Sequence, residues 1–277
     1  MRIDAIIVLY NPKKEYLNSL KKYSNYFSNV YFFDNSTEDD SPIIDELRKK
    51  SNNCIVKFNE NKGIAYALKD GVSKAIDDNA DYVLTMDQDS IFPFEKLETI
   101  KGILKKNTNY GIIGLNFNSN ETDSNIVDTS WWLTSGNFIS ISWYKKLKHG
   151  FDERLFIDAV DQDICYSFKE INAKVGYIKG ISIKHEIGNP KTINLVFKKI
   201  HSLNYNPIRY YYIFRNNYYL YYHRDKKFFK SGLYFAKYNM FFKILFFEDN
   251  KRKKLRACRL GKKDGKTCKL GRCLYDL

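Results

Sequence analysis

The sequence predicts an α/β protein with a mostly parallel central sheet, followed by a helical and basic C-terminal extension. Three observations support this fold class. Strand-length apolar runs alternate with helix-length amphipathic segments over the first half of the chain. Polar, turn-forming residues follow each apolar run. An aromatic and basic composition takes over after Pro190. The β-α-β-α-β order of the first half is typical of parallel sheets with crossover helices.

The first half contains four predicted strands, at residues 3–9, 30–33, 54–58 and 82–86. The first run is apolar apart from Asp4, as expected of a strand that is covered on both faces. Asn11-Pro12 ends this run, and a helix is predicted over residues 13–27. A second helix follows the third strand, because apolar residues recur there at helical spacing: Ile64, Ala67, Leu68, Val72, Ala75 and Ile76.

The second half is less regular. We predict strands at residues 111–117, 126–134, 137–142 and 175–183, the last of which leads to His185. Between the last two, the stretch LFIDAVDQDICYSFKEINA begins acidic and becomes helical, with Ile164, Phe168 and Ile171 on one stripe. The change in composition predicts one α/β domain over residues 1–205 and a helical extension over residues 206–277.

The net charge of +14 is unevenly distributed. Residues 1–190 carry 24 basic and 27 acidic side chains, whereas residues 191–277 carry 22 and 5. A basic tract of this kind indicates a solvated face or an anionic partner. The five cysteines have no paired CxxC spacing, which argues against a zinc site or a disulfide framework. The sequence has no signal-peptide core and no run of 18 apolar residues, so we expect a cytoplasmic protein without a transmembrane helix.

The polar residues at the strand ends predict a ligand-binding cleft, because ligands of parallel sheets bind at the carboxyl ends of the strands. Four ends in succession carry polar groups: Tyr10-Asn11, Asp34-Asn35-Ser36, Asn61-Lys62-Gly63 and Asp87-Gln88-Asp89. Ordinary turns use the same residue types. Asp87 and Asp89 are harder to explain as a turn, because two carboxylates at the end of a buried strand repel each other and are costly to desolvate.

Taken together, these residues resemble the inverting glycosyltransferases of family two, and within them the bacterial rhamnosyltransferases. The resemblance covers roughly residues 3–222. It implies the Rossmann-like glycosyltransferase A fold. Each motif alone is weak, but their order is specific: VLYNP, FFDNS, NENKGIAYAL, MDQDS, TSGNF, GFDERLFIDAVDQDICYSF, KHEIG and RYYYIFRN.

The resemblance implies a nucleotide-sugar donor bound along the strand ends. Asp34 would accept a hydrogen bond from the N3–H of uracil or thymine, and Asn61 and Gly63 would let the backbone approach the nucleotide closely. Arginine matches phosphate geometry, so Arg209 and Arg215 are candidates for the donor phosphates. The predicted donor-binding residues are Tyr10, Asn11, Asp34, Asn61, Gly63, Asp87 and Arg215.

The resemblance also implies a divalent metal, Mn²⁺ or Mg²⁺. Asp87 and Asp89 would hold a hard cation against the diphosphate oxygens of the donor, and this cation would offset the repulsion between the two carboxylates. His185 would complete the metal shell, a role that imidazole can fill. The alternatives are a turn with solvated aspartates and a structural histidine.

Inverting transfer needs a general base for the acceptor hydroxyl. The family places this base at the start of a helix, and the matching position here is Asp161. Asp158 and Asp163 are close rivals, because acidic residues also favour a helix N-terminus for structural reasons. The acceptor side is predicted to include Trp132, Ser135, Gly136 and Asp158. Of the adjacent Trp131 and Trp132, we expect one to belong to the core.

The basic aromatic extension has three interpretations. It is a peripheral membrane-surface segment without a spanning helix, a homo-oligomer interface, or a nucleic-acid-binding surface. We favour the first, at the inner face of the cell membrane, because it suits an acceptor that is a glycan or a lipid-linked oligosaccharide. No nucleic-acid partner is expected, because such a protein would leave the acidic strand ends unexplained.

The predicted activity is transfer of L-rhamnose from dTDP-L-rhamnose to an acceptor in cell-surface polysaccharide synthesis. The main alternative is a UDP-sugar transferase for galactofuranose, galactose or glucose. A nucleotidyltransferase is a further alternative, but residues 8–16 lack the glycine-rich phosphate loop that it would usually need.

Overall fold

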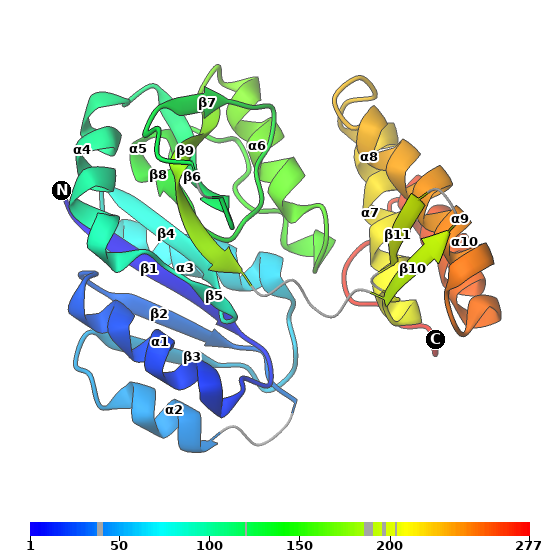
Figure 1. The fold of residues 1–277 in the computed structure, drawn as a ribbon, viewed down its shortest axis with the longest axis horizontal. Coiled ribbons are helices and arrows are strands. Elements are labelled where there is room, and N and C mark those ends of the chain that lie inside the picture. Colours follow the sequence, from blue (N-terminus) through cyan, green and yellow to red (C-terminus); the bar gives the residue numbers. More distant parts are fainter. Residues whose placement is uncertain (38–40, 120, 186–190, 196–197, 203) are drawn as a thin grey trace. The chain divides into compact units, whose positions relative to one another are not determined.

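The fold is that of a computed structural model, which describes residues 1–37, 41–119, 121–185, 191–195, 198–202 and 204–277. At residues 41, 185, 191–195 and 198–202 the description covers the backbone alone. Contacts within the chain define two compact units. Unit 1 comprises Met1–Glu153 and Val160–Glu186, and unit 2 comprises Arg154–Ala159 and Ile187–Leu277 (Figure 1).

Unit 1 is built on a sheet whose strands run in the order β3-β2-β1-β4-β8-β6-β9-β5, with β7 paired to β9. The strands are β1 (Ile3–Leu9), β2 (Val30–Asp34), β3 (Asn53–Lys57), β4 (Tyr82–Asp87), β5 (Ser90–Ile91), β6 (Tyr110–Phe117), β7 (Ile126–Asp128), β8 (Asn137–Ser140) and β9 (Lys174–His185). The first four are parallel neighbours, and β6 is parallel to β9. β8 runs antiparallel between β4 and β6. This α/β sheet confirms the predicted fold class.

Helices connect the strands of unit 1. They are α1 (Leu17–Lys22), α2 (Ser41–Arg48), α3 (Ile64–Asp77), α4 (Leu97–Lys106), α5 (Ile141–Tyr144) and α6 (Val160–Glu170), with short 3₁₀ turns η1 (Lys14–Tyr16), η2 (Tyr23–Asn25) and η3 (Phe94–Lys96). A fourth 3₁₀ turn, η4 (Glu153–Leu155), begins at the last residue of the first segment of unit 1 and continues into unit 2. The continuous helix predicted over residues 13–27 was wrong. Tyr16 and Tyr26 each donate a backbone N–H to the carbonyl three residues earlier, which tightens both ends of this segment into 3₁₀ turns.

Two predicted strands are shorter than expected. The strand predicted over residues 126–134 ends at Asp128, because the Thr129 hydroxyl donates to the Trp131 carbonyl at 3.0 Å and folds the chain into a local turn. The strand predicted over residues 137–142 ends at Ser140, where α5 begins.

The core of unit 1 is made of the buried strands and the helices that cover them. Every residue of β2 is buried, and in β1 only Val8 is partly accessible. An aromatic group (Tyr23, Phe27, Phe92 and Phe94) extends this core, with edge-to-face ring contacts such as the 5.2 Å between Phe92 and Phe94. Such packing fixes the strands in register and therefore fixes where their carboxyl ends lie.

Unit 2 is mainly helical. Its elements are the antiparallel hairpin β10 (Lys191–Leu195) and β11 (Lys198–Ser202), and the helices α7 (Pro207–His223), α8 (Lys230–Tyr234), η5 (Phe235–Met240, a π-helical segment), α9 (Phe241–Phe247) and α10 (Lys251–Lys266). α7 begins where sequence rules predict, because the Asn206 side chain accepts the Arg209 backbone N–H at 2.9 Å and Pro207 occupies the first turn. Among the described residues, no helix is both long and apolar enough to cross a membrane.

α7 and α10 pack very closely. A Cβ atom built at Gly265 would lie 2.2 Å from the Arg215 carbonyl oxygen, and one at Gly261 would lie 2.4 Å from the Tyr211 carbonyl oxygen. Only glycine permits this approach at both positions. The buried residues of α7 and α10, such as Tyr210, Phe214 and Ala257, form the core of unit 2.

Candidate functional site

The carboxyl ends of the parallel strands lie side by side, as predicted. Leu9, the last residue of β1, is in register with Asp34 at the end of β2. On the other side of β1, Val8 is in register with Asp87 at the end of β4. The polar residues that follow β1, β2 and β4 therefore share one edge of the unit 1 sheet (Figure 1).

The Asp87-Gln88-Asp89 turn is held in place by buried hydroxyls. Ser135 is 3% exposed. Its hydroxyl accepts the Asp87 backbone N–H at 3.1 Å and donates to the Ser90 hydroxyl at 3.0 Å. Gly136, at φ +80°, donates its N–H to the Thr85 carbonyl at 2.8 Å. Ser135 and Gly136, which we expected on the acceptor side, thus support the backbone of the aspartate turn.

Gln88 joins this turn to the end of β1. Its Oε1 accepts the Tyr10 backbone N–H at 2.9 Å, and its Nε2 donates to the Tyr10 carbonyl at 2.9 Å. The Tyr10 side chain itself is half exposed. Sequence reasoning did not give Gln88 a role. The position of an amide between two carboxylates could have indicated a structural role, because an amide offers both a hydrogen-bond donor and an acceptor.

Asp34 is fully buried at the end of β2. Its Oδ1 accepts the Ser36 backbone N–H at 2.8 Å. Its Oδ2 lies 3.5 Å from the Lys57 ammonium and accepts no hydrogen bond from the residues that the structure describes. A buried carboxylate oxygen of this kind calls for an explanation, and an incoming N–H donor would supply one.

Two further side chains shape the loops around Asp34. The Asn11 backbone N–H donates to the Ser36 hydroxyl at 2.8 Å, and Asn11 Oδ1 accepts the Thr37 backbone N–H at 2.9 Å. Asn35, which is buried, accepts the Lys62 backbone N–H at 3.0 Å. These hydrogen bonds tie the loop after β1 and the loop before α3 to the end of β2.

The loop before α3 contains the predicted Asn61 and Gly63. Asn61 Oδ1 accepts the Gly63 backbone N–H at 2.8 Å, which makes a local Asx turn. Gly63 precedes α3 with φ +83°, a conformation that glycine adopts without strain. The loop stays close to the end of β2, because the Phe58 N–H donates to the Asp34 carbonyl at 3.1 Å and Asn35 Nδ2 donates to the Gly63 carbonyl at 3.4 Å.

The donor set at the turn suits Mg²⁺ or Mn²⁺. Asp87 and Asp89 are both partly exposed, and one carboxylate oxygen of Asp89 is buried. Among the described residues, no group of three His, Cys, Asp or Glu side chains could hold a metal ion by itself. Mg²⁺ commonly binds through one or two carboxylates together with substrate phosphates, so the pair fits a metal that arrives with a diphosphate.

The predicted metal ligand His185 ends β9, and its backbone is in register with Ser90 on β5. Ser90 lies directly after Asp89 in the sequence. The side chain of His185 lies outside the described residues, so its role as a metal ligand stays a prediction.

Trp132 packs into unit 1. Its ring stacks on Tyr177 at 3.8 Å between centroids, and its Nε1–H donates to the Leu115 carbonyl at 2.8 Å. Trp131 is 37% exposed. The Trp132 ring is therefore engaged in packing on one face, and Trp131 is the more accessible of the two indoles.

The first turn of α6 carries Asp161 and Asp163. Asp161 is partly exposed, and its Oδ1 accepts the Gln162 backbone N–H at 2.9 Å. Asp163 is 3% exposed. A general base needs access to its substrate, so exposure favours Asp161 over Asp163. Burial raises the pKa of the neighbouring Cys165 thiol to about 12, which excludes this cysteine as a nucleophile at neutral pH.

Asp158 belongs to unit 2, where it pairs with Arg209. Asp158 Oδ1 accepts hydrogen bonds from Arg209 Nε at 3.0 Å and from Nη2 at 2.8 Å. Burial raises the pKa of Asp158, and the Arg209 charge opposes that effect. Asp158 also has φ +66°, and the adjacent Ala159 has φ +60°. Tertiary contacts must sustain such backbone conformations.

Arg215 supplies part of those contacts. It is fully buried, and its guanidinium donates to Asn216 Oδ1 and to the carbonyls of Arg154, Leu155 and Gly271. The Asn216 amide donates to the carbonyls of Leu155, Ile157 and Asp158. A buried guanidinium with four protein acceptors has a structural role, so we leave Arg215 out of the proposed phosphate site.

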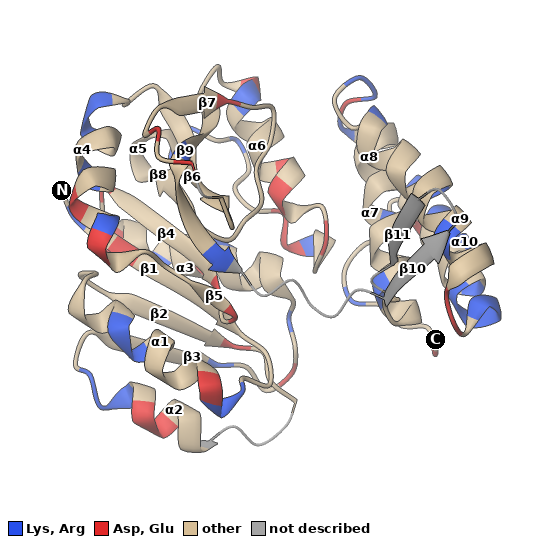
Figure 2. Ribbon diagram, in the orientation of Figure 1, with Lys and Arg blue, Asp and Glu red and all other residues tan. Residues whose placement is uncertain are grey.

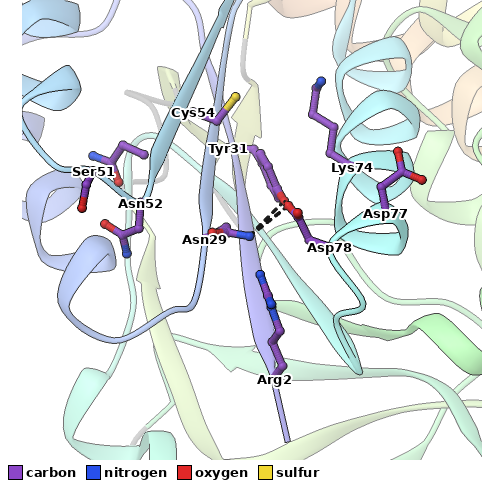
Figure 3. Close-up of a pocket in the computed structure, with 10 residues that line it drawn as sticks. Arg2, Asn29, Tyr31, Ser51, Asn52, Cys54, Lys74, Asp77 and Asp78 are labelled. Carbon is purple, nitrogen blue, oxygen red and sulfur yellow. Dashed lines mark hydrogen bonds between the residues drawn. The ribbon is translucent and has the colours of Figure 1, made fainter.

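A cavity of about 390 Å³ opens at the amino ends of the strands (Figure 3). Arg2 precedes β1, Asn29 precedes β2, and both line the cavity. Asn29 Nδ2 donates to the Asp78 carboxylate at 2.9 Å, and the Tyr31 hydroxyl donates to the same carboxylate. This cavity lies at the opposite end of the strands from Asp34 and Asp87, where the fold does not usually bind ligands.

Comparisons with known proteins agree with this geometry. The model of Glycosyl transferase family 2 matches residues 4–171. The dTDP-rhamnosyl transferase RfbF of Shigella flexneri is 26% identical over 241 residues, which cover 77% of this chain and 78% of that protein.

Solved structures show the same fold. A TarS fragment of S. aureus matches with a TM-score of 0.59 and 16% identity, over 96% of this chain and 81% of that one. GalNAc-T7, solved with UDP, GalNAc and Mn²⁺, matches with a TM-score of 0.55 and 11% identity, over 67% of this chain. This chain spans 44% of the GalNAc-T7 chain. Unit 1 thus has the glycosyltransferase A fold, and with its aspartate-lined strand ends the chain belongs to glycosyltransferase family 2.

Proposed function

We propose that the protein transfers L-rhamnose from dTDP-L-rhamnose to a glycan or lipid-linked acceptor in cell-surface polysaccharide synthesis, with inversion at the sugar carbon. The observation that carries the proposal is the placement of Asp34, Asp87 and Asp89 along one edge of the sheet in a family 2 chain. The choice of rhamnose rests on the similarity to the rhamnosyl transferase of Shigella flexneri.

Asp34 is the proposed anchor for the base of the donor. Its buried Oδ2 accepts no hydrogen bond from any described residue and would accept the N3–H of thymine or uracil. The Asn61 turn and Gly63 hold the neighbouring backbone near Asp34, where it can pass close to the nucleotide. Tyr10 and Asn11, fixed by Gln88 and Ser36, would border the donor from the β1 side.

Asp87 and Asp89 would hold a divalent cation, Mn²⁺ or Mg²⁺, with His185 as a further proposed ligand. When bound, this cation would neutralise charge on the diphosphate leaving group. The two carboxylates need a fixed backbone to face one ion. The Ser135 hydroxyl and the Gln88 amide supply that support.

Asp161 is the proposed general base. As the acceptor oxygen bonds to the anomeric carbon, its proton passes to the Asp161 carboxylate. The bond from the anomeric carbon to the diphosphate breaks on the opposite face, and the diphosphate leaves with the electron pair. One carboxylate suffices, because the leaving group needs no protonation.

A UDP-sugar is the second candidate donor. It is favoured by the fold similarity to TarS of S. aureus in complex with UDP-GlcNAc, which matches with a TM-score of 0.58 and 16% identity over 93% of this chain. Asp34 would accept the same hydrogen bond from uracil as from thymine, so its geometry does not separate the two nucleotides.

The location that suits a lipid-linked acceptor is the cytoplasm, with the protein peripheral at the inner face of the cell membrane. The basic composition of residues 191–277 supports this location, because that leaflet is anionic. A homo-oligomer is the alternative use of the extension.

The test is a donor screen with purified protein. dTDP-L-rhamnose and a set of UDP-sugars are incubated with Mn²⁺ or Mg²⁺, and release of nucleoside diphosphate is measured with and without chelator. We expect release from dTDP-L-rhamnose that chelator abolishes and that Asp89→Ala removes. If Asp89→Ala turns over the donor as fast as the wild type does, the metal assignment is contradicted. If nucleoside diphosphate is released from a UDP-sugar and not from dTDP-L-rhamnose, the UDP-sugar replaces dTDP-L-rhamnose as the proposed donor.

The base assignment has its own test. Asp161→Asn should keep donor affinity but lose transfer by roughly 10²–10⁴-fold, the usual contribution of general-base catalysis. Asp45→Asn is the matched control, because Asp45 is an exposed carboxylate on α2 that pairs with the exposed Arg48. If Asp163→Asn shows this loss and Asp161→Asn does not, the base is misplaced.

A further inference from the structure

Residues 230–247 of unit 2 form one helical segment with an apolar face on the outside. α8, η5 and α9 follow one another without a break, and the residues at their junctions have right-handed helical backbone angles. One face of the segment packs into the unit 2 core through Leu233, Ala236 and Ile244. The other face carries large side chains between 37% and 60% exposed: Tyr234, Phe235, Tyr238, Phe241, Phe242, Leu245 and Phe246.

We call these seven exposed residues the aromatic stripe. Their spacing is helical, so they form one contiguous face rather than scattered exposed residues. Neighbouring rings touch, as in the 4.6 Å between the centroids of Phe242 and Phe246. Contiguous exposed apolar surface on a folded protein marks an interaction site.

Every charged side chain within residues 226–247, which include the aromatic stripe, is a lysine. Residues 226–247 contain no Asp or Glu. Lys230 lies 5.6 Å from the ring of Tyr234, and Lys237 lies 4.9 Å from the ring of Tyr238.

α10, which packs against α9 in the same unit, is rich in Lys and Arg (Figure 2), and all of its exposed residues are basic, so its exposed face is a basic face. Its one acidic residue, Asp264, is buried against the Tyr211 hydroxyl. Its exposed residues are Lys251, Arg252, Lys253, Arg256, Arg259, Lys262, Lys263 and Lys266.

We propose that the aromatic stripe and the basic face of α10 form a docking surface for an anionic lipid bilayer. Aromatic side chains favour the interface between headgroups and acyl chains, and lysines bind anionic headgroups. A second copy of the chain would bring two basic surfaces together, which like-charge repulsion disfavours. Charge complementarity therefore selects the lipid surface as the occupant.

This inference deepens the peripheral-membrane part of the proposed function and names the side chains involved. It does not depend on the donor, because Asp34, Asp87 and Asp89 all belong to unit 1. Its failure would leave the donor screen unaffected, and a failed donor screen would leave vesicle binding unaffected.

The experiment is co-sedimentation of the full-length protein with phosphatidylcholine vesicles that do or do not contain phosphatidylglycerol, over a salt series. The test variant is Phe242→Ser with Phe246→Ser, because these side chains are 49% and 60% exposed and can be replaced without opening the core. The control variant is Tyr26→Ser with Leu274→Ser, which removes two exposed apolar side chains, 47% and 81% exposed, outside the stripe.

We expect the wild type and the control variant to bind the anionic vesicles and the test variant to bind at least about ten-fold more weakly, given the transfer free energy of two half-exposed phenylalanines. Binding should weaken with salt, since surface charges are screened beyond roughly 10 Å at 0.1 M ionic strength. Circular dichroism checks that each variant is folded.

Three outcomes would overturn the proposal. The first is that the wild-type protein does not bind anionic vesicles at low salt. The second is that the test variant binds them as tightly as the wild type does. The third is that light scattering shows the wild type to be an oligomer and the test variant to be a monomer. A fourth arm adds single-stranded oligonucleotide as a competitor. If the oligonucleotide displaces the protein from the vesicles, and if the test variant binds the vesicles as tightly as the wild type does, the surface would be assigned to nucleic acid instead.

Discussion

Replacing Gln88 with Ala is the sharpest test of how the donor site is organised. The substitution removes both hydrogen bonds to the Tyr10 backbone, at 2.9 Å each, and leaves Asp87 and Asp89 in place. A net hydrogen bond contributes about 0.5–1.5 kcal/mol to stability. Because Gln88 is partly exposed, we take the lower half of that range, about 1–2 kcal/mol for the pair.

The lost free energy sets the size of the expected effect on donor binding. Without the Gln88 amide, the turn and the loop after β1 are ordered for a smaller fraction of the time. The apparent affinity for the donor falls in proportion to the population of the ordered site. A loss of about 1–2 kcal/mol corresponds to a dissociation constant that is about five- to thirty-fold larger. The loss cannot exceed the free energy that the two hydrogen bonds contributed to ordering the site.

The assay is calorimetric titration of dTDP and UDP with Mn²⁺ present, for the wild type, Gln88→Ala and Asn107→Ala. Asn107 is the matched control, because its side-chain amide donates to the Ile103 carbonyl at 2.8 Å at the end of α4. We expect the control to bind both nucleotides as the wild type does. Wild-type affinity in Gln88→Ala, with unchanged thermal stability, would refute the view that this amide organises the site.

Two further predictions concern stability. Gly265→Ala should lower the free energy of unfolding of unit 2 by about 1–3 kcal/mol, because its Cβ would meet the Arg215 carbonyl oxygen at 2.2 Å. Gly102→Ala in α4 should raise the free energy of unfolding of unit 1 by about 1 kcal/mol, since its Cβ would have no described atom within 4 Å beyond the adjacent residues and the backbone of its own helix. All three tryptophans lie in unit 1, so their fluorescence reports the unfolding of that unit in Gly102→Ala, and hydrogen exchange of α10 reports the unfolding of unit 2 in Gly265→Ala. If the two changes in the free energy of unfolding had the same sign, the packing argument would be contradicted. Burial also raises the pKa of the Cys165 and Cys258 thiols to about 12, above their ordinary value of about 8.5. The folded state therefore keeps protons that the unfolded state releases, and urea midpoints should fall as pH rises from about 9 towards 12; midpoints that stay constant up to pH 11 would be inconsistent with this linkage.

Strand positions could be predicted from the sequence because a strand buried on both faces must be apolar along its whole length. The runs at β1, β2 and β4 have this pattern apart from the buried Asp4 and Thr85, and a polar residue marks the end of each. The shared edge of the site then follows from parallel pairing alone. These parts of the fold and site depend on local composition, which a single sequence displays.

The supports of the site could not be predicted in the same way. Ser135 lies 48 residues after Asp87, and Gln88 lies 78 residues after Tyr10, so neither hydrogen bond leaves a local pattern. The roles expected for Ser135 and Arg215 came from the family resemblance and, for Arg215, from the match of arginine to phosphate geometry, whereas in the structure their polar groups form hydrogen bonds with atoms of the protein. Hydroxyls, amides and guanidinium groups satisfy buried backbone as readily as they bind ligands, and only tertiary placement separates the two uses.

The helical extension also depends on a segment far from it in sequence. Unit 2 includes Arg154–Ala159, whose carbonyls accept hydrogen bonds from Arg215 and Asn216 on α7. Asp158 within that segment pairs with Arg209 on the same helix. Removing the chain after residue 206 would leave these carbonyls and the partly buried Asp158 carboxylate without these partners, at a cost of about 1–3 kcal/mol for each buried group. The extension is therefore part of what holds the chain just before α6, the helix that carries the proposed base Asp161. For this reason the membrane surface should be tested by point substitution in the aromatic stripe rather than by truncation.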